Sequence, residues 1–133
     1  MPIELKILTW GCVLALVHIF AAVRVKTRQY GTRWNMGARD ETLPPPEPLV
    51  GRLARAQANY FETFPIVAAA ILIDVTAGLT SQWTAVGAML WLGARIVYLP
   101  LYALGTPVVR TMAFGVSMVG IVMLLWPALA AAL

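Results

Sequence analysis

A cation, an amide and an anion lie on one stripe of the chain, inside a long apolar segment. Arg55, Asn59 and Glu62 are four and three residues apart, which places them on one face of an α-helix. An ionisable group in such surroundings costs several kcal/mol unless it is paired or hydrated. The stripe therefore has two interpretations. It is either a structural pair, in which Arg55 or Asn59 holds Glu62, or a polar pocket for a ligand that carries both charges.

A second polar stripe follows in the next apolar segment. Arg95, Tyr98 and Tyr102 are three and four residues apart, so they too share one helix face. The tyrosines are either an aromatic belt at a membrane interface or part of the same pocket. Arg95 is either a ligand contact or the buried partner of Glu62 or Asp74.

Arg110 stands at the start of the last apolar segment, just after Gly105-Thr106-Pro107. Proline suits the first position of a helix, so we expect a helix to begin here. An arginine at such a place is either a topology anchor or a cation that projects between helices and stabilises an anion. Arginine stays charged at any relevant pH, so it can serve in either role.

Three further groups lie alone in apolar segments. We expect His18 to be a core histidine bonded to a neighbour, Asp74 to be paired or interfacial, and Cys12 to be a small buried hydrophobe. The chain has one histidine and one cysteine, so we expect no metal site. It also lacks a glycine-rich phosphate loop and a Ser-His-Asp set.

The composition indicates that membrane helices position these residues. Of the 133 residues, 60% are hydrophobic and 12% are charged, against about 45–50% and about 25% in soluble domains. So small a soluble domain could not bury this much apolar surface, which excludes a soluble enzyme, a disordered chain and a nucleic-acid domain. We expect one all-α integral membrane domain over residues 1–133. Its four predicted transmembrane helices cover about 5–25, 54–79, 83–104 and 108–131, with a loop at about 26–53.

The charge distribution predicts the orientation. Seven Lys and Arg residues lie within 24–55, none lies within 80–82, and Arg110 follows the third apolar segment. Cytoplasmic loops carry such an excess, so the first and third connections are expected to be cytoplasmic and both termini non-cytoplasmic. Arg24 and Lys26 follow the first apolar segment like a stop-transfer flank, which favours a retained helix over a cleaved signal peptide.

Residues 51–65 resemble the signature of the MAPEG family, the membrane-associated proteins in eicosanoid and glutathione metabolism. The chain has every residue of its pattern Arg-Ala-x-x-Asn-x-x-Glu-x-x-Pro, from Arg55 to Pro65. The spacing of Arg95, Tyr98, Tyr102 and Arg110, and the proline-rich loop, are similar to bacterial members over about residues 24–125. The resemblance implies a four-helix bundle that forms a homotrimer in the bacterial inner membrane. It also implies that glutathione binds in clefts between subunits.

The resemblance implies roles by position. Arg110 would be the catalytic residue that stabilises the thiolate, as in microsomal glutathione S-transferases. Either Arg24 or Arg28, near the end of the first helix, would contact a ligand carboxylate. The implied glutathione contacts are Arg55, Gln57, Asn59, Glu62, Arg95, Tyr98 and Tyr102.

The expected function is that of a glutathione S-transferase or peroxidase acting on lipophilic electrophiles. Glutathione, the co-substrate, has two carboxylates, one ammonium and a thiol. Arginines suit the carboxylates, Glu62 suits the ammonium, and a nearby arginine lowers a thiol pKa from roughly 8.5. Two alternatives are a non-enzymatic lipid-binding scaffold with the same clefts and a small proton-coupled exporter. The expected partners are two further copies, membrane lipid and a lipophilic small molecule, but no nucleic acid.

Overall fold

The chain folds entirely into helices, and the computed structural model describes all 133 residues. The four long helices are α1 (Ile3–Tyr30), α3 (Pro48–Thr76), α4 (Gln82–Ala103) and α5 (Pro107–Ala132). A short helix, α2 (Thr32–Met36), lies in the first connection. Each long helix is long and apolar enough to cross a membrane, which confirms the predicted all-helical protein with four spans.

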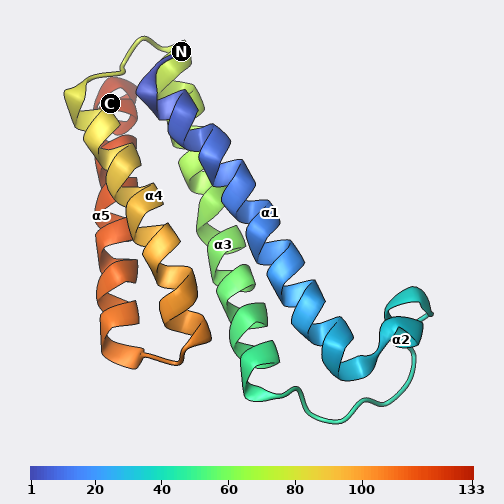
Figure 1. The fold of residues 1–133 in the computed structure, drawn as a ribbon. Helices are drawn as coiled ribbons and strands as arrows, with labels where there is room; N and C mark the ends of the chain where they lie inside the picture. Colours follow the sequence, from blue (N-terminus) through green and yellow to red (C-terminus); the bar gives the residue numbers. More distant parts are fainter.

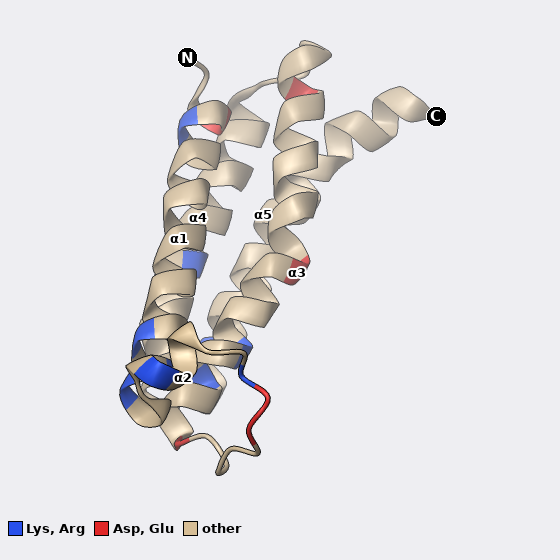
Figure 2. Cartoon of the chain, turned by 90° about the vertical axis from the view of Figure 1, so that its right-hand side faces the viewer, with Lys and Arg blue, Asp and Glu red and all other residues tan.

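The four long helices run alternately up and down (Figure 1). Both termini lie at one end of the bundle, while α2 and the α4–α5 turn lie at the other. The closest pairs are α4 with α5 and α1 with α3, and α1 does not touch α5. Lys and Arg residues gather at the end that holds α2 (Figure 2).

The helices at that basic end extend beyond the predicted ranges. α1 was expected to end near residue 25 and continues to Tyr30, and α3 was expected from residue 54 and begins at Pro48. Apolar character marks only the part of a helix that fits a hydrocarbon core of about 30 Å, or roughly 20 residues. The polar ends remain helical outside that core, so hydropathy alone places the boundaries too close together. The connection between α1 and α3 is therefore shorter than the expected loop at about 26–53, and it contains α2.

Local sequence explains where the helices begin. Pro48 and Pro107 open α3 and α5, at a position where the missing N–H costs no hydrogen bond. The side chain of Ser81 accepts a hydrogen bond from the backbone of Thr84, and the Thr84 side chain accepts one from Ser81, which closes a capping box on α4. The local sequence thus indicates where these three helices begin.

An aromatic cluster fills the centre of the bundle. Tyr60 stacks on Phe64, with 5.3 Å between ring centroids, and Phe64 stacks on Trp91 at 5.9 Å. The Tyr60 hydroxyl donates a hydrogen bond to the carbonyl of Gly11, which ties α3 to α1. Cys12, beside that glycine, is exposed, so its predicted burial is wrong. Cys12 lies on the outward face of α1.

Two glycines allow the close packing of α4 on α5. A β-carbon on Gly120 would lie 2.6 Å from the carbonyl oxygen of Gly87 and 2.7 Å from the backbone nitrogen of Trp91. A β-carbon on Gly87 would lie 2.7 Å from the β-carbon of Met123. Small residues let membrane helices approach in this way, and their backbones then contact each other directly.

Gly120→Ala is expected to lower the free energy of unfolding by about 1–3 kcal/mol, because two rigid backbones must separate to admit one methyl group. Thermal unfolding of the purified protein in detergent measures the change. Gly115→Ala on the same helix is the matched control, since nothing lies within 4 Å of its added β-carbon. Equal unfolding temperatures for the two variants would contradict the close contact.

Candidate functional site

Tyr102 contacts two guanidinium groups at the basic end of the bundle. Arg55 on α3 donates a hydrogen bond from Nε to the Tyr102 hydroxyl at 3.2 Å, and its guanidinium lies 5.9 Å from the ring centroid. Arg110 on α5 lies 4.7 Å from the same centroid. The negative face of an aromatic ring attracts cations, so one α4 tyrosine holds arginines from two other helices. The result is a concentrated positive charge with no acid in contact.

Arg95 on α4 is fully buried beside this pair. Its Nη1 donates a hydrogen bond to Oδ1 of Asn59 at 2.8 Å, and its guanidinium lies 4.4 Å from the Tyr98 ring centroid and 5.3 Å from that of Tyr60. Its Nε and Nη2 have no hydrogen-bond partner. The alternative in which Arg95 pairs with Glu62 or Asp74 is therefore wrong. A buried guanidinium with two free N–H groups is suited to an anionic acceptor.

A cavity of about 200 Å³ lies beside Tyr102 and Arg110. Its lining residues are Asn59, Tyr98, Tyr102, Arg110, Thr111 and Phe114. Arg110 lies in the first turn of α5, where the helix dipole is positive and a further cation is unfavourable. The arginine and the helix end together favour an anion in the cavity. Sequence reasoning missed Thr111 and Phe114, although Phe114 lies one turn after Arg110 on the same helix face.

Glu62 lies on the outer surface of α3 without a partner. Its side chain is exposed and makes no hydrogen bond or ion pair within the chain, since Asn59 is held by Arg95 and Arg55 by Tyr102. The structural-pair interpretation of the Arg55 stripe is therefore wrong. Arg55 is exposed on the same face as Glu62, so a cation and an anion point together out of the bundle.

The sequence profile of the MAPEG family matches residues 7–130, nearly the whole chain. The chain belongs to the MAPEG family. Membership identifies it as an integral, multi-pass membrane protein of the family named for eicosanoid and glutathione metabolism. No curated protein and no solved structure matches the chain.

The MAPEG chain does not bring all the predicted contacts together. Gln57 lies two residues after Arg55, and therefore about 160° around the α3 axis from it. Arg24 and Arg28 are exposed near the end of α1, and Arg28 lines a different cavity from Arg110. The residues that do come together are Arg55, Asn59, Arg95, Tyr98, Tyr102 and Arg110. Gln57 does not line the cavity beside Tyr102.

Two ionisable residues that stand alone in apolar segments, His18 and Asp74, lie away from the cavity beside Tyr102. His18 stacks on Tyr60 with 4.6 Å between centroids, and both its ring nitrogens lack a hydrogen-bond partner. Asp74 is buried near the far end of α3, and neither of its carboxylate oxygens has a partner. The expected hydrogen bond of His18 is therefore wrong, and of the two alternatives for Asp74, paired or interfacial, the pairing is wrong. No three His, Cys, Asp or Glu side chains form a group that could hold a metal ion.

Proposed function

We propose that the chain is a subunit of a membrane-bound glutathione transferase that joins the glutathione sulfur to lipophilic electrophiles. The observation that carries this proposal is the contact of Arg55 and Arg110 with Tyr102, which lines a cavity together with Arg110 and Asn59. Such a concentration of positive charge favours an anionic ligand, and membership of the MAPEG family supports glutathione as that ligand.

Each charge of glutathione finds a suitable group. Arg55 suits a carboxylate, which accepts two parallel hydrogen bonds from one guanidinium. Arg95 is fully buried and acts through Asn59, which it holds beside the cavity. Glu62 suits the ammonium, because it is an exposed carboxylate without a partner on the same face as Arg55. Asn59, held by Arg95, offers its amide N–H₂ to the cavity. These residues bind and orient the tripeptide.

Arg110 acts on the thiol. Its guanidinium and the positive end of α5 lower the thiol pKa, so the proton leaves to water and the anion stays in the cavity. The sulfur lone pair then forms a bond to the electrophilic carbon, and the leaving group departs with its bonding electrons. With a lipid hydroperoxide, the sulfur would take the distal oxygen and release an alcohol. A second glutathione would then displace hydroxide, which leaves as water, to give the disulfide. In either reaction the electrophile enters from the bilayer.

We also propose that the complete site forms between copies in a homotrimer. A cavity of about 200 Å³ is smaller than the 300–1,000 Å³ of usual ligand sites. Glu62 points out of the bundle, and Gln57 lies on a different face of the same helix. A head-to-tail ring places one face of a copy against a different face of the next, and so brings such residues together. The choice of three copies rests on the MAPEG resemblance.

The orientation is part of the same proposal. Lys and Arg gather at the end that holds α2 (Figure 2), and the positive-inside rule assigns that end to the cytoplasm. Both termini then lie on the non-cytoplasmic side. The site opens toward the cytoplasm of a bacterial cell, where glutathione is available, and the protein resides in the inner membrane.

Glu62→Gln tests the proposed binding mode. The substitution keeps the shape and removes the charge, so glutathione affinity is expected to fall about 10–30-fold, the equivalent of one charge-assisted hydrogen bond. Calorimetry on the protein in detergent measures the affinity, and Glu41→Gln, in the exposed first loop, is the matched control. If wild type binds no glutathione at millimolar concentration, the transferase proposal fails and the lipid-binding scaffold replaces it.

A further inference from the structure

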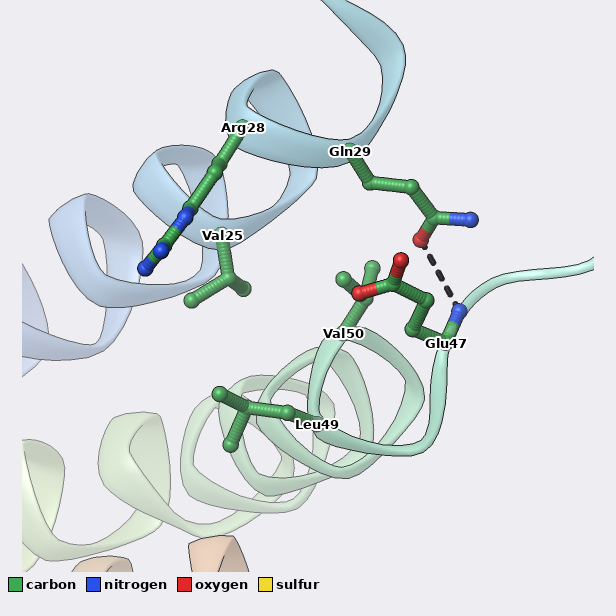
Figure 3. Close-up of a pocket in the computed structure, with 6 residues that line it drawn as sticks. All are labelled: Val25, Arg28, Gln29, Glu47, Leu49 and Val50. Carbon is green, nitrogen blue, oxygen red and sulfur yellow. Dashed lines mark hydrogen bonds between the residues drawn. The ribbon is translucent and has the colours of Figure 1, made fainter.

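A second cavity, of about 350 Å³, lies between the end of α1 and the start of α3 (Figure 3). Its lining residues are Val25, Arg28, Gln29, Glu47, Leu49 and Val50. It shares no lining residue with the cavity beside Tyr102. The groups proposed above to hold glutathione, which are Arg55, Asn59, Glu62 and Arg110, are all absent from its lining.

The cavity has a cation at one end and an anion at the other. Val25 lies between the Arg28 guanidinium and the Glu47 carboxylate (Figure 3), and the two groups form no ion pair. Leu49 and Val50 add apolar wall on the α3 side. Both charged side chains are exposed, so each can accept a partner from outside the chain.

The loop that carries Glu47 is fixed to α1. The Glu47 N–H donates a hydrogen bond to Oε1 of Gln29 at 2.8 Å, drawn as the dashed line in Figure 3. Nε2 of Gln29 donates to the carbonyl of Pro45 at 3.1 Å, and the Tyr30 hydroxyl donates to that of Pro44 at 2.8 Å. The cavity is therefore formed before any ligand arrives, which lowers the entropic cost of binding.

The cavity lies at the depth of lipid headgroups. At about 1.5 Å per residue, the uncharged stretch 7–23 of α1 spans about 26 Å, close to the thickness of a hydrocarbon core. Arg28 lies five residues further along, about 7 Å beyond the core and within the headgroup layer. A phospholipid beside α1 presents its phosphate at this level while its acyl chains lie along the apolar helix.

We propose that this cavity binds the headgroup of a phospholipid that carries both a phosphate and a primary ammonium. Arg28 binds the phosphate through its fork of N–H donors, and Glu47 accepts hydrogen bonds from the ammonium. Val25 and Leu49 contact the carbon atoms between the two charges. A quaternary ammonium has no N–H and needs aromatic rings, none of which lines the cavity. A lipid with a phosphate and no ammonium leaves Glu47 beside uncompensated negative charge.

Native mass spectrometry of the detergent-solubilised protein tests this selectivity. The probes are dioleoyl phosphatidylethanolamine, phosphatidylcholine and phosphatidylglycerol, added singly. Wild type is expected to retain phosphatidylethanolamine about tenfold more strongly than the other two. Glu47→Gln is expected to abolish that preference, and Arg28→Gln to weaken all three lipids. Glu47 makes no side-chain cap to α3, so its replacement leaves the helix start intact.

Matched control variants distinguish the effect of charges in the cavity from the effect of the protein's overall charge. Glu41→Gln and Arg33→Gln change exposed residues of the first connection that do not line it, and both are expected to keep the wild-type preference. Equal retention of the three lipids by wild type would overturn the proposal, as would loss of the preference in Glu41→Gln. Glutathione also carries both an anion and an ammonium, so a glutathione titration tests whether it is the ligand of this cavity instead. If Glu47→Gln weakens glutathione and leaves phosphatidylethanolamine unchanged, the cavity holds the tripeptide and the lipid proposal is wrong.

Discussion

Replacing Arg110 with alanine is expected to lower kcat/KM for a lipophilic electrophile about 10²–10³-fold, the usual effect of deleting a group that stabilises a reacting anion. Glutathione affinity is expected to change much less, because Arg55, Asn59 and Glu62 make the proposed contacts to the tripeptide. The fold is expected to survive, since Arg110 is a cation in the first turn of α5, where it opposes the helix dipole.

The pH dependence identifies the cause of that loss. A cation beside the thiol lowers its pKa, so in wild type the thiolate is present at neutral pH and the rate falls only as the pH drops below that value. Without Arg110 the thiol pKa returns toward roughly 8.5, where only a few per cent is thiolate at pH 7. The pH–rate profile of the variant is therefore expected to move to higher pH, with partial recovery of activity in alkaline buffer.

Ultraviolet absorbance of the thiolate and steady-state kinetics measure the two effects separately. Arg110→Lys retains the charge and loses the planar fork, so it is expected to keep part of the thiolate signal and of the rate. Arg33→Ala, an exposed arginine of α2 outside the cavity, is the control and is expected to match wild type. An unchanged pH profile in Arg110→Ala would assign Arg110 to positioning rather than to the thiol.

The four helices and the polar stripes were predictable from the sequence, because each is determined by the residues of a single segment and not by contacts between segments. Four apolar runs of about 20 residues require four membrane helices whatever their contacts. The spacing of Arg95, Tyr98 and Tyr102 fixes their common face, and the structure confirms it, with Arg95 over the Tyr98 ring and 5.5 Å between the centroids of Tyr98 and Tyr102.

The partners of those residues were not predictable, because they depend on how helices face each other. Spacing along α3 allowed Arg55 or Asn59 to hold Glu62, yet each instead contacts a residue of α4. Nothing in the local sequence indicates that the Tyr60 hydroxyl would reach the carbonyl of Gly11, 49 positions away. The same limit explains α2, a five-residue helix too short to give an amphipathic pattern.

A site shared between copies predicts recovery of activity when two inactive variants are mixed. Arg110→Ala damages the face that holds Tyr102, while Gln57→Leu damages a face about 160° away on α3. In a head-to-tail ring assembled from equal amounts of both variants, about a quarter of the sites receive two intact faces. Activity of the co-expressed mixture is then expected near a quarter of wild type, well above the mean of the two variants measured alone.

The matched mixture joins Arg110→Ala with Glu62→Gln. Arg55 shares its outer face with Glu62, and Arg55 and Arg110 both contact Tyr102, so both substitutions damage the same face of a chain. Every site in that mixture then contains one damaged face, and no recovery is expected however the chains assort. Recovery in both mixtures would place Glu62 on the neighbouring copy, whereas recovery in neither would confine the site to one chain. The pair of mixtures therefore determines which residues act in one chain and which act across the interface.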